Sequence, residues 1–261
     1  FNPPSADAMD YSRSGLIRQI FPAKGNASER RAAMAESTVR GGRRVVIACR
    51  VMEPELNQVL AEGAEDVEIL YLDQALHRTP AKLLGLVQEK IDQVSLTASR
   101  IVLGYGLCSN GVVGVTARQQ GLLIPRCHDC IALFLGSPSR YQEVFREKPG
   151  TYYLTPGWVA EKKDPLGILE EYVPRYGRET AQWVIEEELK HYTHIALIDT
   201  GVEKMAPIRE RAMENAAVLK KQYEEIPGKL EYFRELLRGP YTEEKFLRLR
   251  LGEAFSQEMF F

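Results

Sequence analysis

Cysteine and histidine side chains, which can bind soft metal ions or act in catalysis, gather in one short part of the sequence. Cys108 lies in the motif GYGLCSNG, and Cys127, His128 and Cys130 lie in PRCHDC. Each motif follows a short apolar run that predicts a β-strand, and Cys49 ends a third such run. The carboxyl ends of parallel strands meet at one edge of an open α/β sheet, where ligands bind. We therefore expect the four cysteines to lie close together at that edge.

This cysteine pattern predicts a metal site. Cys127 and Cys130 have the spacing of a pair that holds Zn²⁺ or an iron–sulfur cluster. Cys108 could supply a third thiolate, and Cys49 or His77 a fourth ligand. Soft ligands select Zn²⁺, Cu⁺ or an iron–sulfur cluster rather than Mg²⁺ or Ca²⁺. We take zinc as the first candidate and an iron–sulfur cluster as its alternative, while each cysteine, Cys49 above all, could also be a small buried hydrophobic residue.

The two residues between the paired cysteines are candidates for catalysis. His128 could act as a general acid or base, with Asp129 orienting its ring. Asp129 could instead cap the helix that is expected to begin at Cys130. A metal-free alternative is also open: Cys108 or Cys130 at a helix N-terminus could be a thiolate nucleophile, with His128 as its base.

Four more residues are candidates for binding a cofactor or substrate. Gly104 and Gly106 belong to a glycine-rich segment, which lacks the Lys-Ser/Thr of a phosphate-binding loop and the third glycine of the dinucleotide fingerprint. We expect these glycines mainly to let the backbone pass closely and present Cys108. Tyr153 and Trp158 could line a pocket for a flat or cationic ligand, or could pack their own segment against the core.

The elements that must position these residues alternate along the chain. Strands are predicted at 45–49, 67–72, 101–104 and 122–125, and helices near 53–60, 81–94, 111–120 and 130–135. Such alternation is typical of βαβ units and a parallel sheet. We therefore predict an α/β fold with a mostly parallel sheet and flanking helices.

The rest of the chain is expected to surround this sheet. Pro-Gly pairs and aromatic residues between 136 and 165 predict a loop-rich lid. One more strand is expected at 194–198, and the segment after it is expected to be helical. The predicted division is a polar N-terminal arm (1–43), an α/β metal-site domain (44–225) and a helical C-terminal extension (226–261).

The composition is that of an ordinary globular protein, with 261 residues and a net charge of −2. Such a charge does not favour nucleic acid or anionic lipid as a partner. We see no apolar run near the ~18 residues of a membrane span, and no secretory signal. Cysteines at this density suit metal binding or catalysis in a cytoplasmic protein. We expect a small-molecule substrate, and the Phe-rich C-terminus could pack across a homodimer.

Four longer motifs carry a resemblance to a known family. They are LHRTPAKL at 76–83, GYGLCSNG at 104–111, PRCHDCIALFLGS at 125–137 and PGTYYLTPGW at 149–158. Together they resemble a bacterial and archaeal family of unknown function, DUF1638, over about residues 44–225. The family resembles one of anaerobes that is considered beside corrinoid-dependent methyl transfer, which implies a corrinoid protein or a methyltransferase as partner and assigns no role to any residue.

The function expected from these observations is that of a metal-dependent enzyme, with methyl transfer in anaerobic one-carbon chemistry as the first candidate. A corrinoid would be reached only through a partner protein. The alternatives are an iron–sulfur lyase or redox protein, a metal-free enzyme with a cysteine nucleophile, and a non-catalytic accessory protein.

Overall fold

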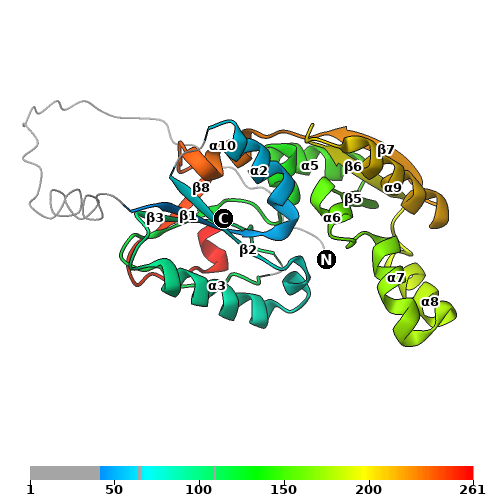
Figure 1. Ribbon diagram of the computed structural model, residues 1–261, viewed down its shortest axis with the longest axis horizontal. Coiled ribbons are helices and arrows are strands. Elements are labelled where there is room, and N and C mark those ends of the chain that lie inside the picture. The colour runs from blue at the N-terminus through cyan, green and yellow to red at the C-terminus, as the bar shows by residue number, and fades with distance from the viewer. Residues whose placement is uncertain (1–41, 64–65, 109, 261) are drawn as a thin grey trace, which may run out of the picture. The chain divides into compact units, whose positions relative to one another are not determined.

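Four apolar segments form the parallel part of a five-stranded sheet in the computed structural model, which describes residues 42–63, 66–108 and 110–260. The strands are β1 (Arg44–Cys49), β2 (Val67–Leu72), β3 (Arg100–Gly104), β4 (Leu122–Pro125) and β8 (Phe246–Leu249). Their order is β2-β1-β3-β4-β8, with β8 antiparallel to β4 (Figure 1). The predicted α/β fold with a mostly parallel sheet is confirmed. The predicted N-terminal arm lies outside the described residues, apart from residues 42 and 43.

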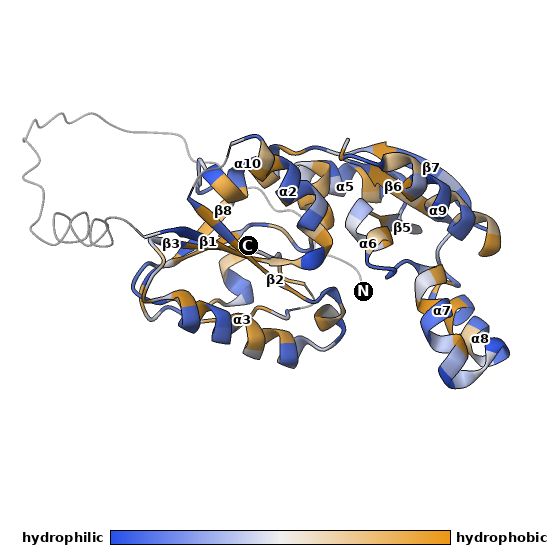
Figure 2. Cartoon of the chain, in the orientation of Figure 1, coloured by the Kyte–Doolittle hydropathy of each residue, from blue (hydrophilic) through white to orange (hydrophobic). Residues whose placement is uncertain are grey.

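Helices cover both faces of this sheet. They are α2 (Glu53–Ala61), α3 (Pro80–Val94) and α10 (Glu231–Arg238). Figure 1 shows α2 and α10 on one face and α3 on the other. The buried residues Leu83, Val87 and Ile91 recur every four positions and give α3 one apolar face, which appears as alternating bands in Figure 2. The interior strand β1 is a continuous apolar run because both of its faces are covered.

The sequence did not predict that the later strands form a separate sheet. Its parallel strands are β5 (Thr151–Leu154), β6 (His194–Asp199) and β7 (Gln222–Pro227). The associated helices are α5 (Pro138–Glu147), α6 (Pro156–Ala160), α7 (Pro165–Tyr176), α8 (Arg178–Glu188) and α9 (Met205–Val218). Helix α9 packs against β6 and β7, and α7 packs against α8. No helix among the described residues is both long and apolar enough to cross a membrane.

The expected loop-rich lid, residues 136–165, contains α5, β5 and α6 instead. Pro138 and Pro156 begin helices here, because proline is tolerated in the first helical turn. The side chains of Ser137 and Thr155 accept hydrogen bonds from the first turns of α5 and α6. This segment therefore consists of two helices and one strand of the second sheet.

Two helix predictions also need correction. Residues 111–120 form turns, since Gly111 and Gly114, the latter with φ +99°, disfavour a helix. The C-terminal residues form α10 but also the strand β8. Phe246 and Phe255, which we expected to be available to a dimer, are buried in the core of this chain.

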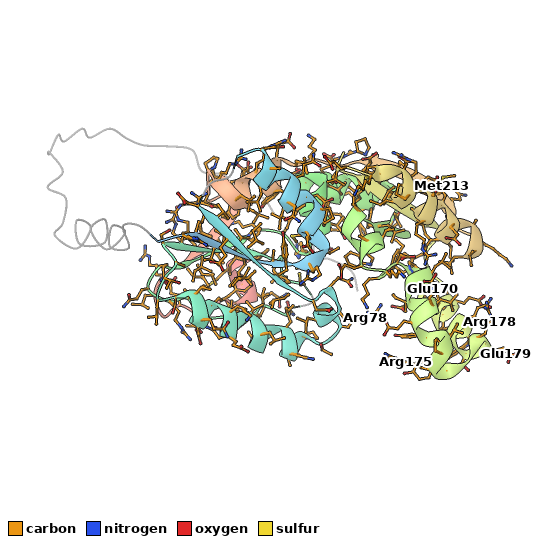
Figure 3. The ribbon with its side chains drawn as sticks, in the orientation of Figure 1. Arg78, Glu170, Arg175, Arg178, Glu179 and Met213 are labelled. Carbon is orange, nitrogen blue, oxygen red and sulfur yellow. The ribbon has the colours of Figure 1, made fainter. Side chains whose placement is uncertain are left out.

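The segment after β1 packs tightly against the second sheet's helix α6. The 3₁₀ turn η1 (Arg50–Met52) follows β1, and a Cβ built on Gly157 of α6 would lie 1.9 Å from the Val51 carbonyl oxygen. Because the backbones of α6 and η1 approach so closely, residue 157 must be glycine. A second contact joins η2 (Gln74–Arg78) to α8: Arg78, labelled in Figure 3, lies 3.9 Å from the carboxylate of Glu188.

We expect Gly157→Ala to lower the free energy of unfolding by about 1–3 kcal/mol, because overpacking forces α6 away from η1. The matched control is Gly85→Ala in α3, where nothing lies within 4 Å of the added methyl group. This control should raise stability by up to about 1 kcal/mol, since alanine is the better helix former. Urea unfolding of both variants measures the difference, and equal stabilities would contradict the close approach.

A buried carboxyl group links α2 to the end of β6. Glu55 is 0% exposed, and its Oε1 accepts a hydrogen bond of 2.7 Å from the Thr200 hydroxyl. Its Oε2 has no hydrogen-bond partner among the described residues. Burial raises the pKa of Glu55 from 4.5 to about 7, and the bond from Thr200 only partly opposes this. Glu55 is thus largely protonated in the folded chain below neutral pH.

The free energy of unfolding should fall as the pH rises from 4.5 to about 7, because the folded chain binds the Glu55 proton more tightly than the unfolded chain does. The pKa difference corresponds to about 3 kcal/mol. In Glu55→Gln this loss should disappear, so that the variant is more stable than the wild type at pH 8. Urea unfolding across this pH range tests the claim, and an unchanged pH profile in the variant would rule it out.

Candidate functional site

Three of the four cysteines line one small cavity at the carboxyl ends of the strands. Cys49 ends β1, Cys108 follows β3, and Cys130 follows β4 and directly precedes α4 (Ile131–Leu135). The cavity has a volume of about 40 Å³. Its lining residues are Cys49, Met52, Asp73, Gln74, Tyr105, Cys108, Cys130 and Trp158. Because the carboxyl ends of parallel strands meet at one edge of the sheet, cysteines that are far apart in the sequence lie at the same cavity.

Backbone hydrogen bonds join the two cysteine motifs. The Leu107 N–H donates to the Cys127 carbonyl at 3.0 Å, and the Cys108 N–H donates to the His128 carbonyl at 3.0 Å. A Cβ on Gly106 would lie 2.4 Å from the same Cys127 oxygen, so this pairing requires glycine. Neither Gly106 nor Gly104, which packs against β1, is part of the cavity lining.

Cys108 has an unusual backbone conformation. Its φ of +46° is in the left-handed region, which disfavours residues that carry a Cβ. Its carbonyl accepts a hydrogen bond of 3.0 Å from Gly111 N–H, and its N–H is held by His128, so the turn is fixed from both sides. Glycine would be relaxed here, and a strained cysteine that lines a cavity points to a role for its side chain.

Burial keeps the four cysteines protonated. It raises the pKa of Cys49 to about 11 and that of Cys108 to about 12, and the pKa values of Cys127 and Cys130 lie well above the usual range. Repulsion between thiolates adds to this, for example between Cys130 and Cys108. Without a positive charge in the cavity, these side chains are therefore neutral thiols.

Several sequence candidates lie outside the cavity lining. Cys127 is buried in the core. The Asp129 carboxylate accepts a hydrogen bond of 2.9 Å from Ile131 N–H, and burial raises its pKa. Helix α4 begins at Ile131 rather than Cys130, so Cys130 and not Asp129 is its N-cap residue. His128 is exposed, with its ring 6.3 Å from that of Phe260.

The other candidates divide between the cavity and its surroundings. Trp158 lines the cavity, whereas the Tyr153 ring packs edge-on against Tyr141 at 5.9 Å. His77 belongs to η2, the same 3₁₀ turn as the cavity-lining Gln74, and its side chain lies outside what the structure describes.

Sequence reasoning missed four lining residues, of which Tyr105 is the most informative. Met52 and Gln74 are buried, and Asp73 accepts a hydrogen bond of 2.7 Å from Ala75 N–H at the start of η2. Tyr105 is 2% exposed, and its hydroxyl has no hydrogen-bond partner within the described residues. Its place inside GYGLC was a usable signal, since a residue three positions before Cys108 follows the same strand end.

No three described Cys, His, Asp or Glu side chains are positioned to hold a metal ion. The cavity-lining cysteines would therefore have to rotate about χ1 to reach one centre. As they stand, the side chains can offer neutral sulfur atoms, one unpartnered hydroxyl and an apolar wall to a small ligand.

Comparison with known proteins places both cysteine motifs within a family. A family model with the description "Protein of unknown function (DUF1638)" matches residues 71–237, which include β3, β4 and α6. The match starts after β1 and therefore does not contain Cys49. No curated protein and no solved structure matches the chain.

In metal-free folded protein at pH 8, we expect iodoacetamide to modify Cys49 about 100-fold more slowly than in the urea-unfolded chain. The reason is that raising the pKa from 9.0 to about 11 removes most of the reactive thiolate. The rate should climb as the pH approaches 11. Mass spectrometry of tryptic peptides gives the rate for each cysteine. Modification of Cys49 at the unfolded rate would show that its thiol is ionised.

Proposed function

Because the chain belongs to the DUF1638 family, whose description assigns no function, we propose a function from the site itself. The protein binds one soft metal ion, with Zn²⁺ as the first candidate, through Cys49, Cys108 and Cys130, and acts as a metal-dependent enzyme. The observation that carries the proposal is that these three sulfur-bearing residues, from three strand ends, line one cavity.

Three features favour a binding site over simple core packing. Protein cores leave few voids, yet a cavity lies beside the cysteines. Cys108 keeps a strained backbone, and Tyr105 keeps an unpartnered hydroxyl. The backbone strain at Cys108 and the unsatisfied Tyr105 hydroxyl both cost free energy, and a ligand bound in the cavity would explain why both are kept.

The chemical types of the lining donors suit a soft cation, although their side chains would have to rotate to reach one. Thiolate sulfur binds Zn²⁺ and Cu⁺, and the thioether of Met52 in the same lining adds a further soft atom. Cysteines that repel each other as thiolates become compatible once a cation balances their charge, and metal binding then releases protons. Three protein ligands leave a fourth position open, which is typical of catalytic rather than structural zinc.

The reaction class we propose is the activation of a small thiol or a methyl-accepting group. A bound Zn²⁺ would supply a Lewis acid. The chain itself would exclude water through Met52 and Trp158 and orient the ligand beside the cysteines. The more specific proposal, corrinoid-linked methyl transfer with a partner protein, has its support in the family resemblance alone. A cytoplasmic location is part of the proposal, and four unpaired cysteines support it.

The alternatives fit the site less well. A cavity of about 40 Å³ has room for an ion with a small ligand, whereas an iron–sulfur cluster needs more space. A metal-free cysteine nucleophile needs a lowered pKa, and burial raises the pKa of each cysteine here.

The decisive experiment is elemental analysis of the full chain purified without oxygen. We expect about one zinc per chain in the wild type and less than about a tenth of that in Cys49→Ala, Cys108→Ala and Cys130→Ala, because each change removes a ligand. Cys127→Ala is the matched control, since Cys127 is equally a cysteine of these motifs but is not part of the cavity lining. Circular dichroism verifies that each variant is folded.

The outcomes separate the candidates. Several irons with acid-labile sulfide would favour the iron–sulfur alternative. Absence of any soft metal from the wild type, or equal metal content in all four variants, would refute the metal site.

A further inference from the structure

One wall of the cavity belongs to the second sheet. Trp158 lies in α6, which follows β5, whereas the other described lining residues lie in or after strands of the first sheet. Helix α6 packs against η1, with the backbone at Gly157 close to the Val51 carbonyl. The position of Trp158 at the cavity therefore depends on how η1, and the helix α2 that follows it, contact the second sheet.

The carboxyl group of Glu55 takes part in this contact between the sheets. Glu55 lies in the first turn of α2, shortly after the cavity-lining Met52, and is 0% exposed. Its Oε1 accepts the 2.7 Å hydrogen bond from Thr200, which directly follows β6. Gln58, also in α2, donates a hydrogen bond of 3.5 Å to the Gly201 carbonyl. Two side-chain hydrogen bonds thus attach α2 to the end of β6, and one of them uses a titratable group.

The surroundings of Glu55 suit a neutral carboxyl group better than a carboxylate. Its Oε2 has no hydrogen-bond partner among the described residues. Ionisation would leave a buried charge with the Thr200 hydroxyl and the backbone N–H of Glu55 itself as donors. A buried charge must be paired or hydrated, and water reaches Glu55 only if α2 moves away from the end of β6. Ionisation therefore favours a loosened contact.

The charged groups near this contact do not neutralise Glu55. The charged or titratable groups on α2 and its neighbours η1, β2, α6, α10 and β6 that bear on the contact are Arg50, Glu53, Glu62, Tyr71, Glu161, Asp199, Glu231, Arg234, Glu235 and Arg238. Arg50 pairs with Glu53 at 3.0 Å. Arg234 pairs with Glu62 at 2.9 Å. No cation of this set is among the causes of the pKa shift of Glu55, which burial dominates.

We propose that the contact between Glu55 and Thr200 is a pH-sensitive switch for access to the cavity. While Glu55 holds its proton, α2 stays closed on the end of β6, and η1 keeps α6 and Trp158 at the cavity. Loss of this proton to solvent loosens the contact and opens the wall at Trp158. The apolar core is continuous between the sheets at Ala196 and Ile198, so the movement is confined to η1, α2 and α6. The switch goes beyond the proposed function, because it concerns access to the cavity whatever the cavity binds.

The test is hydrogen exchange of the full chain, measured by mass spectrometry from below pH 4.5 to above pH 7. Protection factors, corrected for the intrinsic pH dependence of exchange, should fall in the peptides that cover η1, α2 and α6. The fall should reach up to about 300-fold and level off above pH 7, because the pKa of Glu55 is about 7 in the closed contact and returns toward 4.5 in the loosened one. A low concentration of urea should hardly change these rates, since a local opening exposes little new surface.

Three variants isolate the role of the Glu55 proton. Glu55→Gln should abolish the pH dependence, since an amide has no proton to lose in this range. Glu53→Gln is the matched control, because Glu53 lies in the same helical turn but is partly exposed and pairs with Arg50. This control should behave like the wild type. Thr200→Val removes a donor that lowers the pKa of Glu55, so the fall in protection should extend above pH 7.

Each other outcome contradicts part of the proposal. Protection that does not depend on pH in the wild type, or a pH dependence that Glu55→Gln retains, would overturn the switch. A fall in α2 without a fall in η1 and α6 would overturn its link to the cavity. Exchange that rises steeply with urea would identify global unfolding instead of a local opening. None of these readouts depends on a bound metal, so their failure is distinct from failure of the proposed function.

Discussion

The cysteine arrangement depends on the backbone pairing between the loop after β3 and the loop after β4. The two hydrogen bonds from Leu107 and Cys108 to the PRCHDC segment bring cysteines of separate motifs to one cavity. This contact forms because Gly106 has no side chain that would clash with the Cys127 carbonyl oxygen. The same pairing holds Cys108 in its left-handed conformation, so a local backbone strain is balanced by bonds to a neighbouring strand end. Gly106 is therefore required for this backbone pairing, although it is not part of the cavity lining.

Much of the first sheet could be predicted because its interior strands are buried on both faces and appear as continuous apolar runs, as in β1. The strands β7 and β8 were missed for the opposite reason. β7 has a single buried residue, Ile226, and β8 is a short edge strand at the far end of its sheet. The division into two sheets depends on which strands pair, and hydrophobic periodicity along the chain does not contain that information.

The cavity lining could be predicted where the ends of strands decide a residue's position, but not where side-chain contacts decide it. Cys49, Cys108 and Cys130 each follow a parallel strand, so their place at the cavity could be predicted from the strands alone. Cys127 has the spacing of a metal ligand but packs in the core under Gly106. The Asp129 carboxylate accepts a hydrogen bond from Ile131 N–H, whereas the N-cap position of α4 is that of Cys130. The place of Tyr105 just after β3 was visible in the sequence, but a sequence does not reveal that its hydroxyl lacks a partner among the described residues.

The cavity wall is assembled from segments that are distant in the chain, from Cys49 of β1 to Trp158 of α6. An unfolded chain therefore has no equivalent of this wall, and a molecule that occupies the cavity binds the folded form alone. Occupancy at a thousandfold excess over the dissociation constant adds about 4 kcal/mol to the stability of the fold. A molecule that bound there would consequently raise the abundance of the folded protein and its resistance to proteases.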